Sequence, residues 1–362
     1  MSDHLNAFET SPEHVARSSE AIQRRIYRDT DNFFRNLCLD EYENKRGDRW
    51  HRDYSSIETY EASIEPNRRR LEAMLGGYEA MAADLAPETT PFMENECLRG
   101  EWLSIQIANE LRGWALLALP KHGDGPFPLV VCQHGYSTGP ETCFGLGDPA
   151  RLHHEFGQRL VEKGYAVLAP YNVLQGRPRA RFHRQGSLIG KTLFGLETFR
   201  TRRFLDYLST RPDIDGSRIA MWGLSLGGPA TLFAAALDKR IRAALVACWF
   251  NKRLERFITE IPQRASYLVE DVGEHLYLHE WMLEFGDSDL VSLICPRATH
   301  IQTSYGDTSV WWRSAVEEFE AAKAHYERLG LEDRCEQAMH DFGHEINLER
   351  GLAFIDRHLD CD

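Results

Sequence analysis

The feature that most constrains this chain is a single serine held between two glycines. Ser225 stands in the pattern Gly-x-Ser-x-Gly within MWGLSLGGPA, after the apolar run RIAMW and before the helix-forming run PATLFAAAL. Where a strand turns sharply into a helix, a side chain at Gly223 or Gly227 would collide as the two elements approach each other. Such a turn presents the hydroxyl at the carboxyl end of a sheet, where open α/β sheets bind ligands. The pattern therefore predicts a nucleophile at a strand-turn-helix junction.

Short apolar runs alternate with helical patterns from Glu96 onward. The runs 102–110 and 111–120 predict an antiparallel pair of strands. Further buried strands are expected at 128–135, 165–170, 218–225, 243–250, 299–307 and 334–340. Helices are expected between them at 151–164, 195–211, 227–238, 314–330 and 346–359. This order predicts an α/β fold with a mostly parallel, doubly wound sheet.

Residues 1–95 differ from the rest because apolar side chains recur at helical spacing among many charges. We expect them to form an N-terminal helical extension, and residues 96–362 to form the α/β domain. Ile22, Ile26 and Phe33 belong to apolar stripes that need a partner surface. The extension is therefore expected to cover the site or to join subunits into a homo-oligomer.

A serine hydroxyl needs a base and a group that orients this base. In α/β chains with this turn, the two partners follow the serine in the order acid, then histidine. His344, in a loop between the last expected strand and the last helix, is the best base, and His340 is its close rival. Asp307 opens the turn after the strand 299–307 and is the expected acid, with a helix N-cap as its alternative role.

Three other carboxylates are fallbacks for the acid. Asp341 is close in sequence to His344, whereas Asp287 and Asp289 would place the acid one element earlier. Backbone donors for a developing oxyanion are expected from the amide of Leu226, directly after the serine, and from the amide of Tyr136 in the loop HGY.

The pieces HGY, GLSLGG, YGDTSV and GHE, in this order, resemble the serine α/β-hydrolases of the dienelactone hydrolase and acetyl xylan esterase groups. The resemblance covers about 96–362 and implies ester hydrolysis on Ser225, Asp307 and His344. It departs at two points: dienelactone hydrolases carry Cys at the nucleophile position, and the Arg-Gly-Gln triplet of acetyl xylan esterases is missing after the strand 165–170. The resemblance therefore does not carry over a substrate.

Four residues are expected to contact the substrate. Arg177 and Arg181 lie in QGRPRARFHRQG, which has no acidic residue, so they could attract an anionic ester. The alternative is a solvated loop. Trp249 and Phe250 end the strand beside the serine and either line an acyl pocket or belong to the core.

Composition narrows the partners. A formal net charge of −13 argues against nucleic acid, and no apolar run is long enough to cross a membrane. The start of the chain has no apolar core of a signal peptide, and the eight cysteines form no CxxC pair, so we expect a cytoplasmic protein with reduced thiols. No cofactor is expected, and no metal, because His275 and His279 lack a third convergent ligand.

These observations together predict a serine hydrolase that cleaves a carboxylic ester of a small-molecule substrate through an acyl-enzyme. Two alternatives stay open. One is a hydrolase that cleaves an amide or carbon-carbon bond with the same residues, and the other is a noncatalytic binding protein with this fold.

Overall fold

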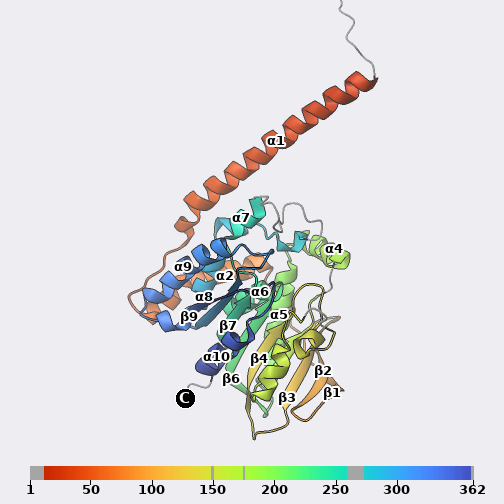
Figure 1. The fold of residues 1–362 in the computed structure, drawn as a ribbon, viewed down its shortest axis with the longest axis vertical. Helices are drawn as coiled ribbons and strands as arrows, with labels where there is room; N and C mark the ends of the chain where they lie inside the picture. Colours follow the sequence, from red (N-terminus) through yellow and green to blue (C-terminus); the bar gives the residue numbers. More distant parts are fainter. Residues whose placement is uncertain (1–11, 148–150, 174–175, 259–272, 360–362) are drawn as a thin grey trace, which may run out of the picture.

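The computed structural model describes residues 12–147, 151–173, 176–258 and 273–359 (Figure 1). Within these residues, nine strands form one sheet in the order β1-β2-β3-β5-β4-β6-β7-β8-β9. The strands are β1 Glu88–Glu94, β2 Leu98–Ala108, β3 Leu111–Pro120, β4 Phe127–Gln133, β5 Ala166–Pro170, β6 Ile214–Leu224, β7 Ile241–Ala247, β8 Ala298–Ser304 and β9 Cys335–His340. From β5 to β9 the neighbouring strands are parallel, whereas β1, β2 and β3 pair antiparallel at one edge.

Helices cover both faces of this sheet. They are α1 Pro12–Lys45, α2 Ile57–Leu75, α3 Phe156–Glu162, α4 Gly176–Ser187, α5 Leu193–Leu208, α6 Gly227–Leu237, α7 Arg253–Ile258, α8 Asp287–Ile294, α9 Trp312–Glu327 and α10 Leu348–Leu359. The core on one face receives side chains from α2, α5, α6, α8 and α9, and the core on the other face from α3 and α10. The sequence-based prediction of a mostly parallel α/β sheet is confirmed.

The N-terminal part is less uniform than the sequence analysis expected. The helix α1 leaves the body and projects outward (Figure 1), and it keeps large apolar side chains such as Ile22, Ile26 and Phe33 more than half exposed. In contrast, α2 is part of the core, because Tyr60 and Ile64 are fully buried.

Residues 88–94 were expected to be helical and instead form the edge strand β1, which pairs with β2. The short alternating segment ETTPFME is too short for a buried helical stripe, and the edge of β2 offers it backbone partners. The division of the chain after residue 95 stays a prediction. No helix within the described ranges is both long and apolar enough to cross a bilayer.

Candidate active site

Ser225 lies in the sharp turn between β6 and α6 that the glycine pattern predicted. Its φ of 57° is in the left-handed region, which side chains other than glycine rarely adopt, so the turn holds the residue in a strained conformation. A Cβ on Gly223 would lie 2.0 Å from the carbonyl oxygen of Gly227, and a Cβ on Gly227 would lie 2.2 Å from that of Gln133. Only glycine therefore allows strand, turn and helix to approach this closely.

His344 and Asp307 lie at the carboxyl ends of the parallel strands, as Ser225 does. Asp307 follows β8 and His344 follows β9, and Nδ1 of His344 is 2.9 Å from Oδ2 of Asp307. The loop of His344 is fixed to the loop of Asp307, because the backbone N–H of Tyr305 donates to the carbonyl of His340 at 2.9 Å. The loops also touch at Gly306, where a Cβ would stand 2.7 Å from the carbonyl oxygen of Phe342.

The carboxylate of Asp307 is buried and well supplied with donors. Its Oδ1 accepts the backbone N–H groups of Ser309 and Val310, at 2.7 and 3.2 Å. Burial acts to raise the pKa of Asp307, but the hydrogen bonds from His344 and from these two amides outweigh burial and lower the pKa. The group is thus held as an anion beside the imidazole, as an orienting acid must be.

A thiol that the sequence analysis did not single out lies against this pair. Cys248 follows β7 directly, with a φ of 55°, and its Sγ donates to the carbonyl oxygen of Glu345 at 3.3 Å. Burial, and then the neighbouring charge of Asp307 and a hydrogen bond to it, raise the pKa of this thiol well above its ordinary value. Cys248 is therefore a neutral thiol beside the acid, with its single S–H shared between the carbonyl of Glu345 and the carboxylate of Asp307. The sequence did carry one signal for this role: Cys248 comes one residue after a buried strand that neighbours the strand leading to Ser225.

The fallback carboxylates are engaged elsewhere. Asp287 is fully buried in an ion pair with Arg253, and Asp289 lies 2.6 Å from Arg52 and 2.9 Å from Arg46. Asp341 is exposed.

The rival base His340 is the last residue of β9. It is 7% exposed, and burial lowers its pKa, so this imidazole is buried in its neutral form. Of the two candidate bases, the hydrogen bond to Asp307 belongs to His344.

The two expected oxyanion donors belong to segments that lie next to the serine. Leu226 precedes the first turn of α6, where backbone N–H groups lack partners four residues earlier in the helix. Tyr136 lies in the loop after β4, and its neighbour Gly135 is so close that a Cβ there would be 3.5 Å from the Cβ of Ser225. The backbone around both amides thus converges on Ser225.

His134 supports this loop. The ring nitrogen Nε2 accepts the backbone N–H of Asn172 at 3.3 Å, while Asn172 also binds the side chain of Gln133 at 3.0 Å. Complete burial lowers the pKa of His134 to about 3, so the ring stays neutral and structural. Arg200 extends this hydrogen-bond network, because it donates to Oε1 of Gln133 at 3.1 Å.

The structure separates the four expected substrate contacts into two groups. Trp249 and Phe250 are 4% and 1% exposed and pack in the core, with Trp249 directly against Gly228 of α6. Arg177 and Arg181 lie on an exposed face of α4, a helix where the sequence analysis expected a loop. Any contact of these four residues with substrate stays a prediction.

Cys248, Asp307 and His344 also place one possible metal-ligand atom each within 4.8 Å of one another. These atoms include the hydrogen-bonded pair of Asp307 and His344, which a bound metal would have to separate.

Comparisons with known proteins find hydrolases among the similar sequences and structures. "Putative hydrolase YtaP" of Bacillus subtilis is 26% identical over 241 residues, which are 64% of this chain and 77% of that protein. The "Putative carboxymethylenebutenolidase" of Saccharomyces cerevisiae is 33% identical over 141 residues, or 37% of this chain and 50% of that protein. The solved acetyl xylan esterase from Paenibacillus sp. R4 superposes with a TM-score of 0.55 at 20% identity, covering 86% of this chain and 98% of the other.

No family model matches the chain. The fold and these similarities define the class: the chain has the α/β-hydrolase fold and resembles hydrolases of the dienelactone hydrolase and acetyl xylan esterase groups.

Proposed function

We propose that this enzyme cleaves a carboxylic ester of a small molecule with Ser225 as nucleophile, His344 as base and Asp307 as orienting acid. The observation that carries the proposal is the 2.9 Å hydrogen bond between His344 and Asp307, at the same sheet edge as the strained turn of Ser225. His344 takes the proton of the hydroxyl as Ser225 attacks the ester carbonyl, and it then returns the proton to the leaving alcohol.

The amides of Leu226 and Tyr136 stabilise the oxyanion of the tetrahedral intermediate. A water molecule activated by His344 then hydrolyses the acyl-enzyme. Every step uses side chains and backbone amides of the chain itself.

The alternative of an amide or carbon-carbon substrate uses the same three side chains, so substrates must separate it from an esterase. The names of the relatives and of the structural neighbour favour esters and include carboxymethylenebutenolidase and acetyl xylan esterase. The third possibility, a noncatalytic binding protein, is disfavoured by the hydrogen bond between the base and the acid.

The test is a series of p-nitrophenyl esters with acyl chains of increasing length, measured beside the matching p-nitroanilides. We expect turnover of esters, little or none of anilides, and a loss of about 10³-fold or more in kcat for Ser225→Ala. Ser217→Ala is the matched control, because Ser217 is exposed near the opposite end of the same strand. Ester hydrolysis by Ser225→Ala at the wild-type rate would remove Ser225 from the mechanism.

Three further properties belong to the same proposal. Arg177 and Arg181 favour esters that carry an anion. The chain forms a homo-oligomer through α1, supported by the exposed apolar side chains of this projecting helix. It works in the cytoplasm, supported by the seven described cysteines, all of which are free thiols.

A further inference from the structure

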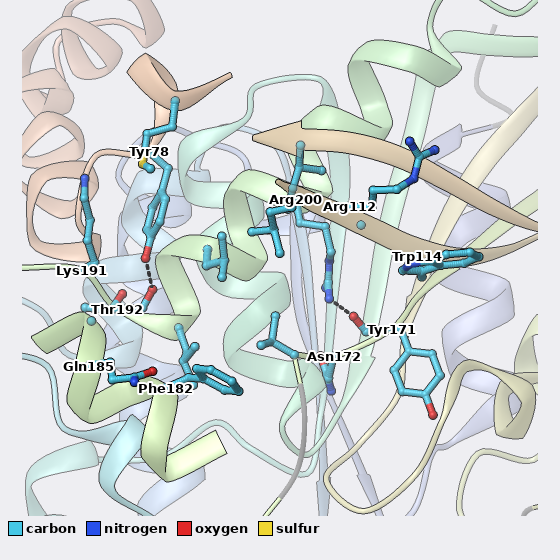
Figure 2. Close-up of a pocket in the computed structure, with 18 of the residues that line it drawn as sticks. Tyr78, Arg112, Trp114, Tyr171, Asn172, Phe182, Gln185, Lys191, Thr192 and Arg200 are labelled. Atoms are coloured by element: carbon cyan, nitrogen blue, oxygen red, sulfur yellow. Dashed lines mark hydrogen bonds between the residues drawn. The ribbon is translucent and has the colours of Figure 1, made fainter. Parts of the chain in front are cut away.

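A cavity of about 950 Å³ lies beneath α4, beside the end of β5 (Figure 2). Its volume lies at the upper end of the range of small-molecule sites. Several large apolar side chains that stay at least 38% exposed line this one cavity: Met81, Leu111, Trp114, Tyr171, Phe182 and Ile189. Exposed apolar side chains gathered around one hollow mark a place where a ligand completes the packing.

The cavity is rich in aromatic rings. Trp102 and Tyr171 are stacked with ring centroids 6.4 Å apart. Tyr78, Trp114 and Phe182 also line the cavity (Figure 2). Aromatic rings favour other flat rings, through offset stacking and edge-to-face contact.

The cations around the cavity already have partners. Lys191 donates to the carbonyls of Gly76 and Gly77, and Arg112 contacts the hydroxyl of Ser104 at 2.9 Å. Arg200 lies in the middle of Figure 2, where it donates to the carbonyl of Tyr171. A ligand here therefore meets a mostly apolar lining whose cationic groups already donate to oxygens of the protein, which favours an uncharged group.

The cavity lies at the carboxyl ends of the parallel strands, as Ser225 does. Tyr171 and Asn172 follow β5, and Asn172 contacts His134 of the loop that approaches Ser225. The strand order is β5, β4, β6, so two strand spacings, or about 10 Å, separate the end of β5 from the turn of Ser225.

The same roof reaches over both places. The helix α4 is tied to the short helix η4 (Glu274–Leu276) by an ion pair between Arg184 and Glu274. His275 of η4 stacks on the ring of Tyr136, with centroids 6.2 Å apart. A series of contacts through α4 and η4 therefore joins the cavity to the loop of Tyr136 beside Ser225.

We propose that this cavity binds an uncharged aromatic or alicyclic ring system of the substrate, carried about 10 Å from the ester carbonyl. The proposal rests on the proposed function, because it assigns the part of the substrate that does not react. Binding energy at this cavity selects esters with a ring at that reach.

The substrates are p-nitrophenyl esters whose acyl group carries a naphthyl ring at the end of a linker of two to eight methylenes. The reference substrate is p-nitrophenyl acetate. We expect kcat/KM to rise with linker length to a maximum near a reach of about 10 Å. Phe182→Ala is expected to lower kcat/KM for the best naphthyl ester about tenfold, and to change it less than twofold for the acetate. Phe33→Ala is the matched control, because Phe33 is also an exposed phenylalanine, at 61%, but lies on α1 outside this cavity.

A binding measurement separates the two proposals. Naphthalene-methanol is titrated into the Ser225→Ala variant while the tryptophan fluorescence of the protein is followed. Saturable quenching that becomes weaker in the double variant Ser225→Ala with Phe182→Ala supports binding in the cavity. If this binding is observed but the wild type hydrolyses none of the esters, the proposed function alone is overturned. Hydrolysis of the acetate, without a gain from the naphthyl group and with equal effects of Phe182→Ala and Phe33→Ala, would overturn the cavity proposal alone.

Discussion

Arg179 of α4 and Glu197 of α5 form an ion pair inside the protein, with Nη1 2.6 Å from Oε1 and both side chains at most 1% exposed. Arg179 also donates to the carbonyl of Val173 at 2.9 Å. This pair turns one side of α4 toward the core. Arg177 and Arg181, each two positions from Arg179 in the sequence, therefore lie on the exposed side of the helix. Breaking a buried pair of this kind by removing one partner is costly, so Arg179 is unsuitable for tests of substrate binding.

The exposed arginines give the first prediction. Replacement of both Arg177 and Arg181 by alanine is expected to raise KM for a hemisuccinate ester about three- to tenfold, because two cations near an anionic substrate are lost. The KM for a neutral ester of equal size should stay within twofold, and added salt should reproduce the effect on wild type. Equal changes for both esters would leave these arginines without a role in binding.

The acid gives the second prediction. Asp307→Asn is expected to lower kcat by about 10³- to 10⁴-fold with little change in KM, because an amide favours the wrong tautomer of His344. Asp289→Asn is the control: it weakens contacts with Arg46 and Arg52 and so lowers the melting temperature, while kcat stays close to wild type. A larger loss of kcat in Asp289→Asn than in Asp307→Asn would show that the acid is misassigned.

Cys248 gives the third prediction, as a positioning residue. Cys248→Ala removes the donor beside Asp307, and we expect kcat to fall about fivefold, the equivalent of one hydrogen bond, with KM unchanged. Cys248→Ser restores a donor and should recover most of this loss. Because burial raises the pKa of the thiol, iodoacetamide at pH 8 should not inactivate the wild type. Equal kcat in the Ala variant and in wild type would argue against the positioning role.

Glu318 gives the fourth prediction, on stability. Burial, and then the nearby charge of Asp287, raise the pKa of Glu318 to about 7, above that of an unfolded glutamate. The folded protein therefore binds more protons than the unfolded chain between about pH 4.5 and 7, and stability falls as the pH rises through this window. This loss is at most about 3 kcal/mol by pH 8.

Glu318→Gln keeps an acceptor for the backbone N–H of Ser288 and cannot ionise. Its stability relative to wild type should therefore increase from pH 5 to pH 8, as measured by urea denaturation. Glu317→Gln, on the exposed side of the same helix, serves as control, and a parallel pH dependence in both variants would contradict the assignment.

The helix α1 gives the fifth prediction. We expect full-length protein to have a native mass that is a multiple of 41.6 kDa. Ile22→Glu with Ile26→Glu should convert it to a monomer with unchanged esterase activity, because both side chains are 53% exposed on the projecting helix. Gln23→Glu adds charge on the same helix and should leave the mass unchanged. A monomeric full-length chain in light scattering would rule out the oligomer.

Much of the fold follows from local sequence patterns. The strand that precedes Ser225 and the helix after it were predicted from one apolar run, two glycines and an alanine-rich segment, because these features act between neighbours in the chain. The antiparallel pair β2 and β3 was predicted for the same reason. The edge strand β1 was not, since its partners come from β2 rather than from its own residues.

The sequence by itself determined which side chains could serve as nucleophile, base and acid, because the order and the element after which each one falls are written along the chain. Only the tertiary structure decided which of them meet. Asp307 and His344 come together because β8 and β9 are adjacent and parallel, while Asp289, as acidic as Asp307, is held by Arg46 and Arg52. The thiol of Cys248 beside the acid and the cavity beneath α4 were likewise decided by packing, since contacts between residues far apart in sequence leave no periodic pattern in it.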